Sequence, residues 1–311
     1  MTRMGDVLAG MHSAWEFDTD SVLIRFERGI RTPRIFQVLG ERRVPYEALG
    51  SVELTPGRKR GTVVLRAVPR RGADPLMDAA DGQLRESWDP YRLVLPAERA
   101  SLAEGCLRQL RSALGPAADE PAERHLVDAP APPLRFKGYD GKVLFDGTTV
   151  FLRWSRTGAS SVKWKAGDQA YPVSELGGVE WRYAETASRH GGEAPGHLRL
   201  LRRGVTVDRR DQPPADQDPA AVVFGLGQGV VHESLPLAAA VLQAVRTAEP
   251  ATVPAAPPPV SFPAVPGAAP TGRADPADIA ERIRHLGELH EAGLVTDEEF
   301  TAKKNELLTQ L

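Results

Sequence analysis

Apolar and polar residues alternate in short runs along much of the chain before residue 230. In residues 22–27, Val22, Ile24 and Phe26 fall on one face and the residues between them on the other. A period of two is typical of β-strands, whose successive side chains point to opposite faces of a sheet. The same alternation occurs in three further runs: 62–66, 150–154 and 162–165, where Val162 and Trp164 alternate with Lys163 and Lys165. These runs therefore predict strands.

Two later stretches change to a helical period, and both follow a series of strands. After Pro96 the apolar stripe consists of Leu102, Cys106, Leu107, Leu110 and Leu114; before residue 248 it consists of Leu237, Val241, Leu242 and Val245. The glycine-rich stretches 57–61 and 177–178 predict turns between strands. Short antiparallel strands followed by one helix predict a mainly β fold. We expect two β-sandwich or small-barrel domains, each capped by its C-terminal helix.

The two strand-rich parts of the chain are copies of one another. Three pairs of segments carry the match: 17–26 with 145–154 at a shift of 128, 45–53 with 172–180 at a shift of 127, and 110–113 with 245–248 at a shift of 135. A nearly constant shift over about 100 residues indicates a duplicated domain, with loops that differ in length.

Composition marks the boundaries between segments. Five prolines lie in 115–133, and eight of the 21 residues in 250–270 are proline. Such stretches cannot bury enough apolar surface to offset their chain entropy, and proline favours the extended polyproline II conformation. We expect five segments: copy one (12–114), a linker (115–133), copy two (134–248), a disordered Pro/Ala-rich linker (249–272) and a helical hairpin (273–311).

The hairpin has signals for both of its helices. Asp275 can cap the first helix, Pro276 suits its first position, and Gly293 can end it. Residues 296–299, Thr-Asp-Glu-Glu, form a capping box for the second helix. The apolar positions of this hairpin are Ile283, Leu286, Leu289, Leu294, Phe300, Leu307 and Leu308.

So small a hairpin does not stabilise itself easily. Domains below about 40 residues usually need a disulfide, a metal or a partner, and this one has no cysteine. Its large apolar side chains would each contribute about 1.5–3 kcal/mol if buried. We therefore expect self-association or a protein partner through residues 273–311, in preference to docking on the chain's own domains, which the long linker also permits.

Several stretches resemble known families. Residues 44–54, Val-Pro-Tyr-Glu-Ala-Leu-Gly-Ser-Val-Glu-Leu, resemble the signature of bacterial pleckstrin-homology-like (PH-like) domains, and 171–181 resemble it again. With the Asp-Pro steps at 74–75 and 89–90, the pair is similar to an uncharacterised tandem family of high-GC Gram-positive bacteria. This resemblance implies two orthogonal sheets and a C-terminal helix in each copy, and no particular reaction.

The hairpin resembles a second family, the short C-terminal SHOCT domain. The match rests on 291–296, Glu-Ala-Gly-Leu-Val-Thr, and on Glu299-Phe300. It implies an assembly or docking element attached to unrelated domains.

Charge and cysteine content exclude several classes of protein. Thirty-nine basic and 41 acidic residues give a net charge of −2, so no overall field attracts nucleic acid or an anionic membrane. Cys106 is the single cysteine, which excludes an intrachain disulfide and a multi-cysteine metal site, and its helical spacing predicts a buried thiol. Because no apolar segment follows Arg3, we expect no secretory signal and a cytoplasmic protein.

No catalytic, cofactor or metal site emerges from the motifs. Residues 225–229, Gly-Leu-Gly-Gln-Gly, invite a phosphate-loop interpretation, but Val230 stands where the dinucleotide fingerprint requires glycine. The acidic residues of 74–86 lack the calcium-loop spacing and are interpreted as a solvated insertion. We therefore expect a protein that is not an enzyme and has no cofactor and no small-molecule substrate.

Basic clusters suggest a second hypothesis. The candidate anion-binding residues are Arg28, Arg31, Arg34, Arg58, Lys59 and Arg60. Our first hypothesis is a non-enzymatic cytoplasmic interaction or scaffold protein with tandem PH-like modules and an oligomerising or partner-docking hairpin. The alternative is a peripheral membrane adaptor whose basic loops bind anionic lipid headgroups.

Overall fold

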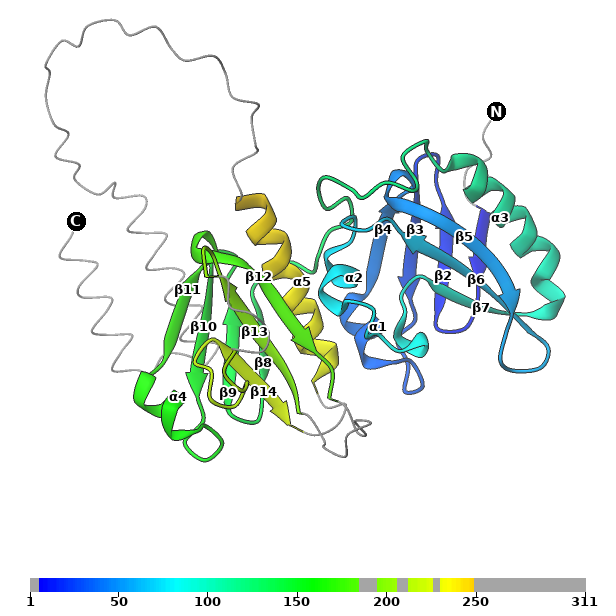
Figure 1. Ribbon diagram of the computed structural model, residues 1–311. Helices are drawn as coiled ribbons and strands as arrows, with labels where there is room; N and C mark the ends of the chain where they lie inside the picture. The colour runs from blue at the N-terminus through cyan, green and yellow to red at the C-terminus, as the bar shows by residue number, and fades with distance from the viewer. Residues whose placement is uncertain (1–5, 185–194, 206–211, 226–229, 249–311) are drawn as a thin grey trace, which may run out of the picture. The chain divides into compact units, whose positions relative to one another are not determined.

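Each copy contains a four-stranded and a three-stranded antiparallel sheet followed by a helix (Figure 1). The computed structural model describes residues 6–184, 195–205, 212–225 and 230–248. These residues confirm the expected mainly β fold of two β-rich domains, each ending in a helix.

In the first copy the sheets have the orders β1-β2-β3-β4 and β5-β6-β7. The strands are β1 (Asp6–Ala9), β2 (Ser13–Phe17), β3 (Ser21–Phe26), β4 (Glu41–Pro45), β5 (Leu49–Pro56), β6 (Thr62–Pro69) and β7 (Arg92–Pro96). The helices are α1 (Arg34–Leu39), α2 (Pro75–Ala80) and the C-terminal α3 (Ala100–Ala113), with a 3-10 turn at Glu86–Trp88.

The second copy repeats this arrangement with the sheet orders β11-β10-β9-β8 and β12-β13-β14. Its strands are β8 (Leu134–Lys137), β9 (Gly141–Phe145), β10 (Thr149–Trp154), β11 (Gln169–Pro172), β12 (Leu176–Arg182), β13 (Gly196–Arg202) and β14 (Ala221–Gly225). Its helices are α4 (Ser161–Ala166) and the C-terminal α5 (Val231–Ala248).

The two sheets of each copy meet at the same point. The amide of Met11 donates to the carbonyl of Val94 at 2.8 Å, and in the second copy Tyr139 donates to Val223 at 2.7 Å. A glycine precedes each donor because the strands approach so closely there. A Cβ at Gly10 or at Gly138 would lie 2.6 Å from the same carbonyl oxygen. This closure links the first hairpin to the last strand in both copies.

A second repeated feature holds the three-stranded sheets together. In each copy an arginine of the middle strand lies between a glutamate of the first strand and the aspartate of an Asp-Pro step. The ion pairs are Arg66 with Glu53 (3.5 Å) and Asp89 (3.3 Å), and Arg199 with Glu180 (3.4 Å) and Asp218 (2.9 Å). Because the set recurs in both copies, its role is to support the fold of the repeat.

The alternation at 162–165 does not mark a strand. These residues form helix α4, capped by the Ser160 side chain, which accepts a bond from the amide of Lys163. Lys163 is wholly buried, whereas Val162 and Trp164 are about half exposed. The strand prediction was wrong because four residues are too few to distinguish a period of two from the period of a helix. The pattern also assumed that the lysines face solvent, whereas Lys163 is buried with polar partners.

Three smaller expectations also need correction. Gly177 and Gly178 lie inside β12, where the pairing register shifts, and form a bulge instead of a turn. Leu102 is 64% exposed, and Ala103 takes the buried position of α3 instead. Asp74 is not solvated: it is buried and caps α2 by accepting from the amide of Leu76 at 2.8 Å.

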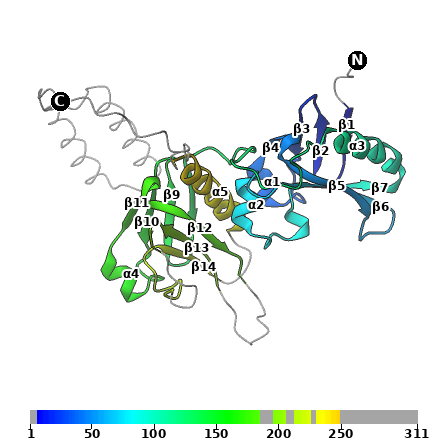
Figure 2. The ribbon, with the colours of Figure 1, turned by 45° about the horizontal axis from the view of Figure 1, so that its top comes forward.

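Helix α5 of the second copy is covered on more than one side. It packs on β8 and β12 of its own copy and on α1 and α2 of the first copy, and α2 runs beside it in both views (Figures 1 and 2). Ten of its residues are buried, against three in α3. The buried apolar residues of the two copies consequently form one continuous core.

Polar contacts reinforce this junction. The side-chain amide of Gln83 donates to the carbonyl of Trp181 and accepts from the amide of Tyr183, both at 3.1 Å. The guanidinium of Arg246 donates to the carbonyls of Gly72 at 2.9 Å and Ala122 at 2.8 Å. Each side chain therefore ties backbone of one segment to another, and the Arg246 guanidinium also forms a long ion pair with Asp78 at 4.0 Å.

No helix in the described parts of the chain has the length and apolar character that crossing a bilayer requires.

Candidate anion-binding cleft

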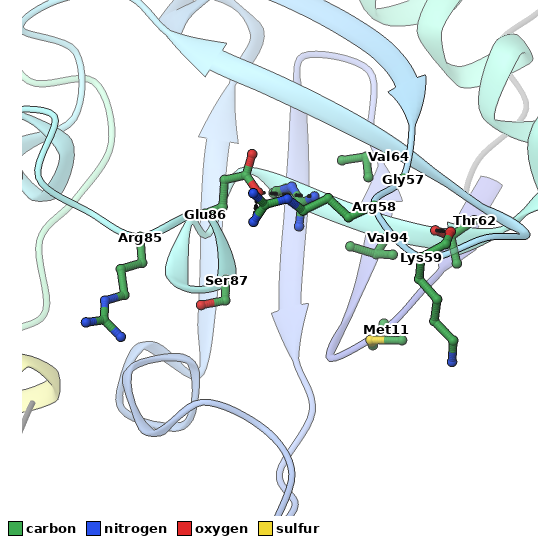
Figure 3. A pocket seen from close by; sticks show the side chains of 11 residues that line it. Met11, Gly57, Arg58, Lys59, Thr62, Val64, Arg85, Glu86, Ser87 and Val94 are labelled. Carbon is green, nitrogen blue, oxygen red and sulfur yellow. Dashed lines mark hydrogen bonds and ion pairs between the residues drawn. The ribbon is translucent and has the colours of Figure 1, made fainter.

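A cleft of about 640 Å³ lies on the β6–β7 part of the first copy's three-stranded sheet (Figure 3). We call it the basic cleft. Its walls are the β5–β6 turn and the segment 85–87. Its apolar side chains are Met11, Val64 and Val94, its basic ones are Arg58, Lys59, Arg85 and Arg92, and its acidic one is Glu86. The sheet supplies the floor, and the loops supply most of the charge.

Two hydrogen bonds within the β5–β6 turn hold its shape. The amide of Gly57 donates to the carbonyl of Thr62 at 2.8 Å, and the hydroxyl of Thr62 donates to the carbonyl of Lys59 at 2.6 Å. A Cβ on Gly57 would collide with the Thr62 hydroxyl, and Gly61 has a φ of +76°. These glycines let the chain reverse tightly and place Arg58 at the edge of the cleft.

Two arginines from different elements share one carboxylate. Glu86 lies 3.7 Å from Arg58 and 3.8 Å from Arg92, and Figure 3 shows the Arg58 side chain extending toward it. Both distances exceed the 2.7–2.9 Å or so of a charge-assisted hydrogen bond. Arg58 is 89% exposed and Arg92 is 18% exposed, so Arg92 is the more enclosed cation. The two guanidiniums therefore face a shared space that Glu86 occupies only loosely.

Arg85 also borders the cleft, but its charge is engaged elsewhere. Its guanidinium carbon lies 5.2 Å from the ring centroid of Trp88 and 5.1 Å from that of Tyr183 in the second copy. In Figure 3 its side chain points away from Glu86. A cation over aromatic faces is stabilised by the ring electrons. Segment 85–88 thus contributes both to the cleft and to the contact between copies.

Two described sheet positions of the second copy differ from those of the basic cleft. By strand register, Ala221 stands where Arg92 stands in the first copy, and His197 stands where Val64 stands. The repeated Glu-Arg-Asp set is retained in both copies. The sheet framework is therefore common to the repeat, whereas the cation that Arg92 supplies to the cleft has no counterpart at Ala221.

Comparisons with known families agree with this duplication. The model of a family described as Domain of unknown function (DUF4429) matches residues 15–109 and 143–242, more than half of the chain. The chain belongs to the DUF4429 family. A model described as Short C-terminal domain (SHOCT) matches residues 281–308. No curated protein matched the sequence. The expected order of a tandem family of unknown function followed by a SHOCT domain is confirmed.

The structure separates the basic residues that the sequence grouped as candidates. Arg58 and Lys59 line the basic cleft of the first DUF4429 copy, whereas Arg60 on the same turn does not. Arg28, Arg31 and Arg34 lie in or next to the β3–α1 connection and do not line it. All six residues are exposed: Arg28, Arg31, Arg34, Arg58, Lys59 and Arg60.

Sequence reasoning missed Arg92, and it interpreted Glu86 only as part of a solvated acidic insertion. Arg92 begins β7, where Leu93 and Leu95 are buried, so the period of two already placed its side chain on the outer face. Nothing in the sequence, however, indicated that the turn at 57–61 would lie opposite it. The apolar residues of the hairpin named above, Ile283, Leu286, Leu289, Leu294, Phe300, Leu307 and Leu308, lie outside the described residues.

Proposed function

We propose that this protein is a non-enzymatic cytoplasmic assembly protein. Its two DUF4429 copies act as one binding head (residues 6–248), and its SHOCT segment joins several chains or docks a protein partner. The observation that carries the single binding head is the burial of α5 between the copies, with the continuous apolar core that results. Modules that share a core present their surfaces at a fixed separation, as a scaffold requires.

The topology of each copy supports a binding role. Each copy has two sheets followed by a C-terminal helix, which is compatible with the arrangement that the PH-like resemblance implied. Fold alone is a weak argument for function. The assembly role rests more on the SHOCT match at 281–308 and on the apolar residues of so short a hairpin.

Light scattering during size-exclusion chromatography tests the assembly role. We expect the full chain to have a mass that is a multiple of the monomer, and a chain ending at residue 270 to be monomeric. Equal monomeric masses for the two proteins, together with no partner retained through the hairpin, would contradict the proposal.

Single substitutions in the hairpin give a sharper test. Phe300→Ala or Leu286→Ala should weaken assembly by about 2–5 kcal/mol if the side chain is buried in the interface. Lys304→Ala, which changes a charged position of the same hairpin, serves as the control and should leave the dissociation constant nearly unchanged. Sedimentation over a dilution series measures all three variants.

One observation favours the membrane alternative. Ile30 is fully exposed at the β3–α1 connection, with Arg28 and Arg31 on either side. An apolar side chain flanked by cations suits the surface of an anionic bilayer. Under this alternative the chain floats with anionic vesicles at low salt, and Arg31→Glu or Ile30→Ser abolishes flotation. If flotation survives both changes, this loop is not the contact.

A further inference from the structure

We propose that the basic cleft binds a phosphate monoester whose apolar substituent rests on the floor at Met11 and Val94, beside the buried Val64. The proposal concerns the first copy alone and does not depend on assembly through the hairpin.

The charge around the cleft favours an anion. Arg58, Lys59, Arg85 and Arg92 border it, and Glu86 is the single acidic residue among those that line it. Because the Arg85 guanidinium lies over two aromatic rings, three cations remain for a ligand and exceed the one carboxylate by two charges. A phosphate monoester carries a charge of about −1.5 to −2 at pH 7, which matches this excess.

Glu86 indicates where the anionic group would lie. Its carboxylate is between Arg58 and Arg92 at 3.7 and 3.8 Å, too far for short hydrogen bonds to either guanidinium. Three terminal phosphate oxygens can accept bonds from both arginines at once. The Glu86 side chain is 63% exposed, so it can turn toward solvent when a ligand enters. A carboxylate ligand would make the same contacts with Arg58 and Arg92 that Glu86 already makes, so it should bind more weakly than a phosphate monoester.

The floor suits an apolar substituent. Met11 is 49% exposed beside Val94, and the backbone bond between these two residues fixes their position. Covering exposed apolar surface contributes roughly 25 cal/mol per Å². A phosphate on a ring or an alkyl group should therefore bind more tightly than inorganic phosphate.

Calorimetry on the full chain tests the proposal with phenyl phosphate as the probe. We expect saturable binding of phenyl phosphate, weaker binding of inorganic phosphate and weaker binding of phenylacetate. Arg92→Gln should lower the affinity for phenyl phosphate by about tenfold or more, because it removes a charged donor. Glu86→Gln should raise that affinity, because it removes a competing carboxylate. Arg60→Gln, on the same turn but outside the cleft, is the matched control and should bind like the unchanged chain.

Vesicle binding distinguishes a membrane lipid from a soluble molecule as the source of the phosphate monoester. Stronger binding to vesicles containing phosphatidic acid than to vesicles of equal charge containing phosphatidylglycerol, abolished by Arg92→Gln, indicates a lipid phosphate. Binding of phenyl phosphate without this vesicle preference indicates a soluble ligand; either result supports the site. The proposal is overturned if phenyl phosphate does not bind, if phenylacetate binds equally well, or if a folded Arg92→Gln variant binds as before. A fall in affinity on Glu86→Gln would also overturn it.

Discussion

Lys163 lies in α4 at the position that Phe36 occupies in α1, as the shift of 127 between the copies shows. Phe36 stacks on Phe26 with the ring centroids 4.7 Å apart. In the second copy Trp154 replaces Phe26, and the Lys163 ammonium lies 4.8 Å from its ring centroid. Equivalent positions thus hold an aromatic pair in one copy and a cation over an aromatic ring in the other.

The ammonium of Lys163 has enough partners to remain buried. It donates to Asp140 at 2.5 Å and to the carbonyls of Ala215 and Ala221, both at 2.7 Å. Burial lowers the pKa of Lys163 and raises the pKa of Asp140, because a low-dielectric interior disfavours both charged forms. The ion pair is therefore held in place by its hydrogen bonds, and neither charge is stable there without the other.

Removing this lysine should be costly. Lys163→Met leaves the Asp140 carboxylate buried without its cation, and the free energy of unfolding should fall by about 3–5 kcal/mol. Lys165→Met, an exposed neighbour on the same helix, should change it by less than about 0.5 kcal/mol. Urea denaturation followed by circular dichroism compares the two, and equal stabilities would refute the interpretation.

His197 should make stability sensitive to acid. Its Nε2 is buried without a hydrogen-bond partner among the described residues, and burial, with Arg199 nearby, lowers its pKa below the ordinary 6.5. Below pH 6.5 this histidine therefore binds a proton more readily in the unfolded chain than in the folded chain, so the free energy of unfolding should decrease as the pH falls. His232 acts in the same direction, because burial lowers its pKa as well.

Denaturation at a series of pH values checks this prediction. His197→Gln should flatten the decline below pH 6.5, and the double variant His197→Gln/His232→Gln should flatten it further. A decline as steep in the double variant as in the unchanged chain would assign the acid sensitivity to other groups.

At the scale of elements, the C-terminal helices show how one repeat acquires two roles. Helix α3 buries a single stripe that includes Cys106 and Leu110, as its spacing predicted, and leaves its other side to solvent. Helix α5 is rich in alanine, and Ala238, Ala239 and Ala240 are all buried. Small side chains allow other elements to approach a helix closely. The second copy therefore uses its capping helix as the contact between copies.

The sheet closures should tolerate no added side chain. Gly138→Ala would place a Cβ 2.6 Å from the carbonyl oxygen of Val223, so we expect a loss of about 1–3 kcal/mol from overpacking. Gly105→Ala in α3 meets open space and should be neutral or stabilise the protein by about 0.5–1 kcal/mol. Thermal unfolding of the two variants distinguishes them. Similar melting temperatures would show that the backbone near Gly138 can shift to admit a methyl group without loss of stability.

At the scale of the whole described unit, the two copies should unfold together. Arg246→Met keeps an apolar stem but removes two donors that join α5 to Gly72 and Ala122, and should cost about 1–3 kcal/mol. We also expect faster amide exchange in α2 and α5, because these helices pack against each other. Arg108→Met, an exposed change on α3, is the control. Unchanged exchange in α2 would mean that the junction does not depend on Arg246.

The amino-acid sequence by itself determined the duplication, the mainly β fold and the capping helices. Periods of two and of about 3.6 arise from local backbone geometry, and residues such as Val22 and Ile24 are buried where their spacing placed them. The tertiary structure alone decided that 162–165 is a helix, since the buried lysine depends on Asp140 and on carbonyls over 50 residues away. It also decided that Arg58, Glu86 and Arg92 meet in one cleft. Such juxtapositions depend on which strands pair and how loops cross them, and local periodicity carries no information about either.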